Sequence, residues 1–187
     1  MLLEYFKKIK PENKDYNVFF KWLGLNLLSI ALIGLAWLNG LVQLVVESDS
    51  THIVMIIAGL TIVATIMSGI RALDISRRTV QSKAMSVASV NHKFYYRKLS
   101  FIRLLGTTAV LLGLIGTVLG FIITLSGVTP DTIGNVDQIG KLVSVLMNGM
   151  GVALYTTLIG AMANVLITFD LHILKHGTAE MIDEMES

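Results

Sequence analysis

The sequence predicts an all-α membrane protein with four transmembrane helices. The chain has 187 residues, of which 53% are hydrophobic and 15% charged. Its mean hydropathy of +0.70 is too high for an ordinary soluble domain. Asp, Glu, Lys and Arg are absent from four stretches, residues 22–46, 50–70, 104–130 and 142–169. Each stretch reaches the roughly 20 residues that a helix needs to cross a bilayer. The expected spans are 22–46, 53–70, 104–127 and 142–169.

The segments outside these spans are too short to bury a separate soluble core. We therefore expect one membrane domain, and the chain divides into an arm, this domain with its connector, and a tail. The expected ranges are 1–20 for the arm, 21–127 and 128–170 for the domain, 71–103 for the connector and 171–187 for the tail.

The arm at 1–20 has the pattern of an amphipathic helix. Leu2, Leu3 and Phe6 fall on one helical face, opposite the lysines, until Pro11 ends the pattern. The arm is expected to lie along the membrane surface. The first apolar run is too long for the core of a signal peptide, so we expect it to remain as a signal anchor.

The basic residues gather on one side of the expected membrane domain. With four spans, 14 of the 15 Lys and Arg residues fall on the side of the arm, connector and tail, and Lys141 is the exception. Short cytoplasmic loops carry an excess of Lys and Arg. Both termini are therefore expected in the cytoplasm, with the chain in the bacterial inner membrane.

Spans three and four differ from the first two because they are rich in glycine. Small residues let helices pack closely, which explains any isolated pair of such glycines. Spans one and two are expected to form an outer layer that faces lipid. The candidate packing residues are Gly113, Gly116, Gly120, Gly149, Gly151 and Gly160.

The same two spans carry threonines near their middles. A single threonine inside a membrane helix usually bonds to a carbonyl of its own helix. Thr117, Thr156 and Thr157, however, cluster on two neighbouring glycine-rich spans. Together they could line a narrow polar path for a small cation. They are the candidate ion-path residues, and a transient sodium ion is the only metal that we expect there.

None of the four expected spans contains Asp, Glu, Lys or Arg. Proton relays and cation pumps usually place an ionisable group within the membrane. The chain is therefore expected either to conduct nothing or to borrow a carboxylate from another subunit.

Soluble chemistry has little support. The chain has no cysteine, and Gly149-Met150-Gly151 lacks the third glycine of a dinucleotide loop. His172 and His176 could share a metal but have no clear third ligand. The basic and aromatic residues of the connector fit orientation and the headgroup region better than nucleic-acid binding. We expect no enzyme, no cofactor and no nucleic-acid partner.

Two motifs resemble those of the MotA/TolQ/ExbB family. One is Gly-Thr-x-x-Gly in the third span, from Gly116 to Gly120, and the other is Ala-Leu-x-Thr-Thr-x-x-Gly in the fourth, from Ala153 to Gly160. The resemblance covers residues 104–170. Val152 stands where TolQ and ExbB carry a glutamate. Together with the four spans, this makes the chain more similar to the MotA and PomA branch.

The resemblance implies a pentameric ring around a single-span partner of the MotB, ExbD or TolR type. The partner, as a dimer, would supply an aspartate that takes H+ or Na+ near Thr117, Thr156 and Thr157, and ion flow would do mechanical work. The glycine-rich spans would face the ring interior and neighbouring subunits.

One departure from the flagellar branch is the short connector. Flagellar MotA has a large cytoplasmic domain between spans two and three, whereas residues 71–103 leave no room for one. This difference argues against driving a rotor. Two other functions remain open, a self-contained small channel or transporter and a non-conducting scaffold. The ion, the partner and the process that is driven are not fixed by the sequence.

Overall fold

The structure, a computed structural model, describes residues 17–49, 51–84, 92–126 and 136–186. Across these ranges the chain is helical apart from short turns, and they contain no strand. The helices are α2 (Asn17–Leu38), α3 (Leu41–Ser48), α4 (Ile53–Ala84), α5 (His92–Ser126) and α7 (Val136–Glu186). The predicted surface helix at the start of the arm lies outside the described residues.

Four of the helices are long and apolar enough to cross a membrane. These segments are Asn17–Leu38, Ile53–Arg77, Leu99–Ser126 and Leu142–Glu180. The prediction of an all-helical protein with four candidate membrane-spanning helices is therefore confirmed.

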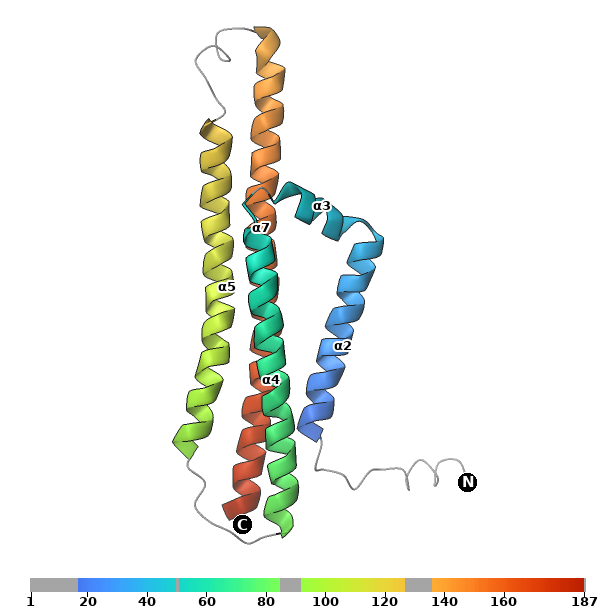
Figure 1. The fold of residues 1–187 in the computed structure, drawn as a ribbon, viewed down its shortest axis with the longest axis vertical. Coiled ribbons are helices and arrows are strands. Elements are labelled where there is room, and N and C mark those ends of the chain that lie inside the picture. The colour runs from blue at the N-terminus through green and yellow to red at the C-terminus, as the bar shows by residue number, and fades with distance from the viewer. Residues whose placement is uncertain (1–16, 50, 85–91, 127–135, 187) are drawn as a thin grey trace, which may run out of the picture.

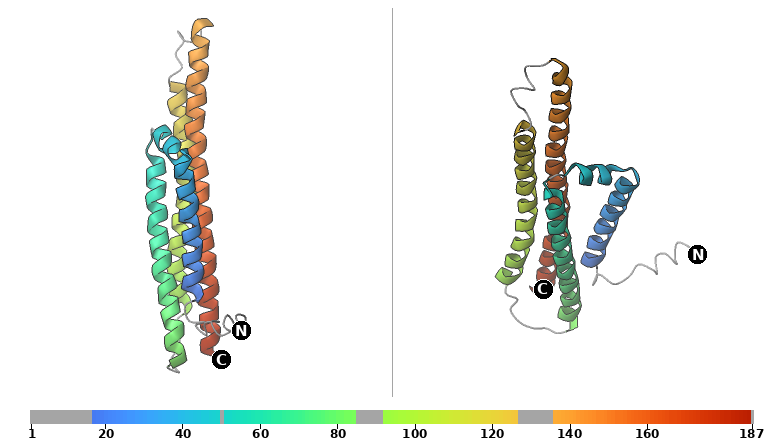
Figure 2. Two further views of the ribbon diagram at one scale, coloured as in Figure 1. Left: turned by 90° about the vertical axis from the view of Figure 1, so that its right-hand side faces the viewer. Right: turned by 45° about the horizontal axis from the view of Figure 1, so that its top comes forward.

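The helices form a bundle built around the antiparallel pair α5 and α7 (Figure 1). Helix α4 packs against both members of this pair, whereas α2 lies beside α4 and α7 only near its own start and then diverges (Figures 1 and 2). We call the end at which α2 begins the basic end. It carries Lys21, Arg71, Arg77, Arg103 and Lys175.

The expected first span, 22–46, is not one continuous helix. Helix α2 ends at Leu38, and α3 begins at Leu41 and lies across the bundle (Figure 1). The break falls at Gly40, whose φ of 76° is left-handed and costs glycine little because it has no Cβ. Its amide donates to the carbonyl of Trp37 at 3.0 Å, which closes the end of α2.

Helix α7 is much longer than a membrane span. Its 51 residues would extend roughly 75 Å, against a bilayer core of about 30 Å. It joins the expected fourth span and most of the tail, 171–187, in one helix. Likewise α4 and α5 run well into the connector expected at 71–103, so this connector is largely helical.

The main apolar core lies toward the basic end and draws on four helices. Its buried members are Val18, Ala64, Ala72, Ile75, Leu99, Ile102, Ile167, Leu171 and Leu174. Beyond this core, the second half of α2 makes little contact with the bundle, and Leu32, Leu35 and Leu38 are more than half exposed. The tertiary contacts of α2 are therefore concentrated in its first half, near the basic end.

Candidate functional site: a threonine cluster between two helices

The three threonines predicted from the sequence lie together between α5 and α7. Thr117 comes from α5, and Thr156 and Thr157 come from α7. The hydroxyls of Thr117 and Thr157 contact each other directly. The antiparallel packing of the two helices brings the middle of one against the middle of the other. We call these three residues, with the carbonyl oxygens of Gly113 and Ala153, the threonine cluster.

Every hydroxyl in the threonine cluster has more than one acceptor. Thr117 Oγ1 lies 3.1 Å from each of the two carbonyl oxygens, Gly113 O and Ala153 O. Thr156 Oγ1 lies 2.9 Å from Ala153 O and 3.3 Å from Gly113 O. Thr157 Oγ1 lies 3.2 Å from Gly113 O. A hydroxyl has one hydrogen to donate. The hydroxyls can therefore rotate between acceptors without leaving a donor unpaired.

The three threonines differ in their exposure. Thr156 is fully buried between the helices, with no exposed surface. Thr117 and Thr157 are only partly buried. Thr156 therefore lies inside the contact between α5 and α7, whereas Thr117 and Thr157 lie at its edge.

Two glycines of α5 make room for the threonines of α7. A Cβ added at Gly113 would lie 2.9 Å from the carbonyl oxygen of Thr156, and one added at Gly116 would lie 2.7 Å from Thr156 Oγ1. Carbon contacts this short are repulsive. Glycine at both positions is what allows the hydroxyls of α7 to reach the backbone of α5.

The remaining predicted packing glycines are not alike. Added Cβ atoms would lie 3.1 Å from Ala153 Cβ at Gly120 and 2.6 Å from Ala109 O at Gly160, and at Gly149 one would overlap the Thr124 side chain. At Gly151 the nearest atom would be 3.9 Å away, in the Tyr155 ring. Apart from Gly151, these glycines serve the contact between α5 and α7 within one chain. That the two glycine-rich spans face the ring interior and neighbouring subunits stays a prediction.

Comparison with known proteins gives one clear match. The model of the MotA/TolQ/ExbB proton channel family matches residues 57–187, which is more than half of the chain. The chain belongs to the MotA/TolQ/ExbB family. No curated protein and no solved structure matches it. The matched region begins in α4 and contains the whole threonine cluster. As a MotA/TolQ/ExbB member, the chain is a membrane protein of the proton channel type, a type that is not enzymatic.

The other candidates from the sequence do not form sites in this family member. Gly149-Met150-Gly151 lies inside α7, so it makes no phosphate-binding loop. His176 Nε2 lies 3.6 Å from Glu180 Oε1 on the exposed face of the same helix. Within the described residues, no group of three His, Cys, Asp or Glu side chains could hold a metal ion.

The structure shows a buried carboxylate directly after residue 169, where the expected fourth span ends. The fourth candidate span continues past residue 169, and Asp170 within it is only 1% exposed. Its carboxylate accepts hydrogen bonds from Asn26 Nδ2 at 2.9 Å and Ser68 Oγ at 2.7 Å. Asp170 is not among the residues predicted from the sequence, because the expected span ends at the first charged residue. Asn26 and Ser68, polar residues within two other spans, were the available signal.

Proposed function

We propose that this MotA/TolQ/ExbB family member is the ring-forming subunit of an ion-driven motor or energy transducer in the bacterial inner membrane. Five copies would surround a dimer of a single-span partner of the MotB, ExbD or TolR type. The observation that carries the proposal is the threonine cluster. It contains the hydroxyls of two partly buried threonines, Thr117 and Thr157, and none of the hydrogen-bond partners of these hydroxyls is a carboxylate.

An ion that passes the threonine cluster would need a negative charge from elsewhere. Moving one elementary charge through 100 mV releases about 2.3 kcal/mol, so the work done per ion would be of that order. A carboxylate can bind a cation and neutralise it within the membrane. An aspartate on the partner's single span would supply this group next to Thr117 and Thr157.

The charges at the ends of the bundle support a topology with both termini in the cytoplasm. Lys21, Arg71 and Arg103 lie at the basic end, whereas Glu47 and Asp49 lie at or near the α3 end of the first two spans. Basic residues beside membrane spans favour the cytoplasmic side. The basic end would therefore face the cytoplasm.

We propose sodium as the transported ion, with the proton as the alternative that the experiment must exclude. Hard cations bind several oxygen ligands at once. The partner carboxylate, the hydroxyls of Thr117 and Thr157, and a carbonyl such as that of Gly113 would together provide such a set. A proton needs fewer partners, so it would tolerate the loss of one hydroxyl better. No resident cofactor is required.

The test is ion flux through vesicles that contain the chain with a single-span protein encoded next to it. Flux should require this second protein and should fall at least tenfold when sodium is replaced at fixed pH and membrane potential. Thr157→Ala should cause a similar loss. Thr61→Ala is the matched control, because the Thr61 hydroxyl bonds only to the carbonyl of Ile57 in its own helix.

Three results would count against the proposal. Rapid flux through the purified chain alone would favour a self-contained channel. An absence of flux with every single-span neighbour would favour a scaffold. Equal activity of Thr157→Ala and Thr61→Ala would return Thr157 to a packing role. Flux that requires the partner but does not depend on sodium would contradict the sodium assignment. The proposed ring would stand, and the transported ion would be the proton.

A further inference from the structure

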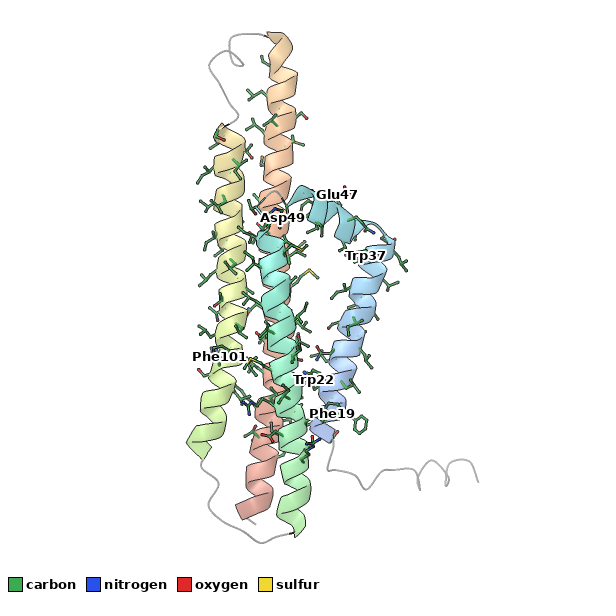
Figure 3. The ribbon with its side chains drawn as sticks, viewed as in Figure 1. Phe19, Trp22, Trp37, Glu47, Asp49 and Phe101 are labelled. Carbon is green, nitrogen blue, oxygen red and sulfur yellow. The ribbon has the colours of Figure 1, made fainter. Side chains whose placement is uncertain are left out.

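A second polar cluster lies on the other side of α7, between α7, α2 and α4. It consists of Asp170, Asn26, Ser68 and Trp22, and we call it the Asp170 cluster. Asn26 Nδ2 donates to Asp170 Oδ1 at 2.9 Å, and Ser68 Oγ lies 2.7 Å from Asp170 Oδ2. Trp22 Nε1 donates to Ser68 Oγ at 2.8 Å, and Figure 3 shows Trp22 on the part of α2 beside α4.

The Asp170 cluster is separate from the threonine cluster. Asp170 follows Thr157 by roughly 20 Å along α7 and points to nearly the opposite side of that helix. Asp170 and Ser68 are 1% and 0% exposed, and Asn26 is 6% exposed. A charged carboxylate in such a place is costly unless it is well hydrogen-bonded.

No cation neutralises Asp170 in the described part of the chain. The ionisable groups toward the basic end of the packed helices include Lys21 on α2, Arg71, Asp74 and Arg77 on α4, Arg103 on α5, and His172, Lys175 and His176 on α7. Arg71 pairs with Asp74 at 3.8 Å, and His176 pairs with Glu180. All the hydrogen bonds that Asp170 receives come from uncharged groups.

Both amide hydrogens of Asn26 have acceptors, which fixes a donor against Oδ1 of Asp170. One Nδ2 hydrogen of Asn26 goes to Asp170 Oδ1, and the other goes to the carbonyl of Trp22 at 3.0 Å. Turning the amide would place its oxygen against two other acceptors, so this orientation is fixed. Asp170 Oδ1 faces an N–H donor, whereas Oδ2 faces the Ser68 hydroxyl, which can accept, so a proton on Oδ2 has a hydrogen-bond acceptor.

Ser68 can hydrogen-bond to Asp170 whether the carboxyl group is ionised or protonated. Its hydroxyl has two acceptors within reach, Asp170 Oδ2 at 2.7 Å and the carbonyl of Thr65 at 2.9 Å, but only one hydrogen. When Asp170 is ionised, Ser68 donates to Oδ2. When Asp170 is protonated, Oδ2 donates to Ser68 Oγ, and Ser68 turns its hydrogen to Thr65. In both arrangements Ser68 Oγ accepts from Trp22, and both Asp170 oxygens and the Ser68 hydroxyl keep hydrogen-bond partners.

We propose that the Asp170 cluster is a proton-binding site that this subunit carries itself. The proton comes from water at the basic end, adds to Oδ2 to form a neutral carboxylic acid, and leaves by the reverse step as Ser68 rotates. Because Trp22 and Asn26 lie on α2, the site also fixes α2 to α4 and α7 in both states. The inference does not depend on the threonine cluster or on a partner protein.

The test is infrared difference spectroscopy of the unmodified chain in lipid vesicles between alkaline and acidic pH. A carbonyl stretch of a protonated carboxylic acid should appear reversibly on acidification. It should shift when the aspartate side chains are labelled with carbon-13. The band should be absent in Asp170→Asn and retained in Asp49→Asn, which changes the other buried aspartate.

A second pair of variants tests the geometry. Removing the hydrogen bond to a carbonyl oxygen raises its stretching frequency, so Asn26→Leu should move the band upward. Asn39→Leu is the matched control, because Asn39 directly follows the end of α2 at Leu38 and its amide donates to the carbonyl of Leu35 at 2.8 Å. It should leave the band unchanged.

Three outcomes would overturn the proposal. The first is the absence of an aspartate band at any pH at which the protein stays folded, since Asp170 would then remain ionised. The second is a band that does not change with pH, because the carboxyl group would then hold the helices together without taking up or releasing a proton. The third is an equal effect of Asn26→Leu and Asn39→Leu.

Discussion

Replacing Gly116 by alanine tests whether the fit between α5 and α7 stabilises the fold. The added Cβ would lie 2.7, 2.8 and 3.0 Å from Oγ1, Cβ and Cγ2 of Thr156. Carbon atoms pack best at about 3.5–4.0 Å. The two helices would have to separate by up to about 1 Å around Thr156, and its hydrogen bonds to Gly113 and Ala153 would lengthen with them.

The expected magnitude follows from two opposing terms. Overpacking of this kind costs about 1–3 kcal/mol. Exchanging glycine for alanine inside a helix returns up to about 1 kcal/mol. Gly24→Ala should show only the gain from exchanging glycine for alanine, because an added Cβ at Gly24 has no neighbour within 4 Å. Gly116→Ala should therefore be about 1–3 kcal/mol less stable than Gly24→Ala.

The assay is reversible unfolding of the purified protein in mixed micelles, followed by circular dichroism. Thr156→Gly removes all three of the clashing atoms, so it completes a double-mutant cycle with Gly116→Ala. The destabilisation of the double variant should fall below the sum of the two single changes by about 1–3 kcal/mol. If the single changes add within about 0.5 kcal/mol, the contact does not exist as described and the reasoning is refuted.

Two further predictions concern the turn between α2 and α4. Asp49→Ala removes the acceptor for the Val54 amide, at 2.8 Å from Asp49 Oδ2, and should cost about 1–2 kcal/mol. Hydrogen exchange in the first turn of α4 should quicken, and unchanged protection there would contradict the capping role. Gly40→Ala should lower the stability by about 1 kcal/mol because φ is 76° at this position. Gly40→Asn should cost less in the same unfolding assay, and equal losses would point to packing instead.

The number and approximate places of the membrane helices were within reach of the sequence alone. Charge-free apolar stretches of sufficient length have few alternatives to spanning a bilayer, because every backbone polar group must then be paired internally. The threonine positions were also predictable, since the motifs around Gly116 and Thr157 fix their spacing. Whether Thr117, Thr156 and Thr157 conduct an ion stays a prediction.

The helix boundaries were less predictable because they depend on local geometry and not on hydropathy. Residues 22–46 are uniformly apolar, yet the left-handed turn at Gly40 divides them and sends α3 across the bundle. Conversely, the charged residues of the expected tail do not end α7, because a helix can continue beyond the membrane into water. Hydropathy locates what enters the membrane, whereas turns and caps decide where each helix stops.

The sequence by itself determined that this protein is a four-helix membrane protein with hydroxyls and glycines gathered in its last two spans. Only the tertiary structure decided which of these residues meet. It placed Thr156 inside the contact and Thr117 and Thr157 at its edge, a distinction that depends on how α5 and α7 are rotated about their axes. It also brought Asp170 to Asn26, 144 residues away, which made a buried carboxylate tolerable. Apolar length is a property of each segment, but the pairing of a polar group depends on its neighbours in space.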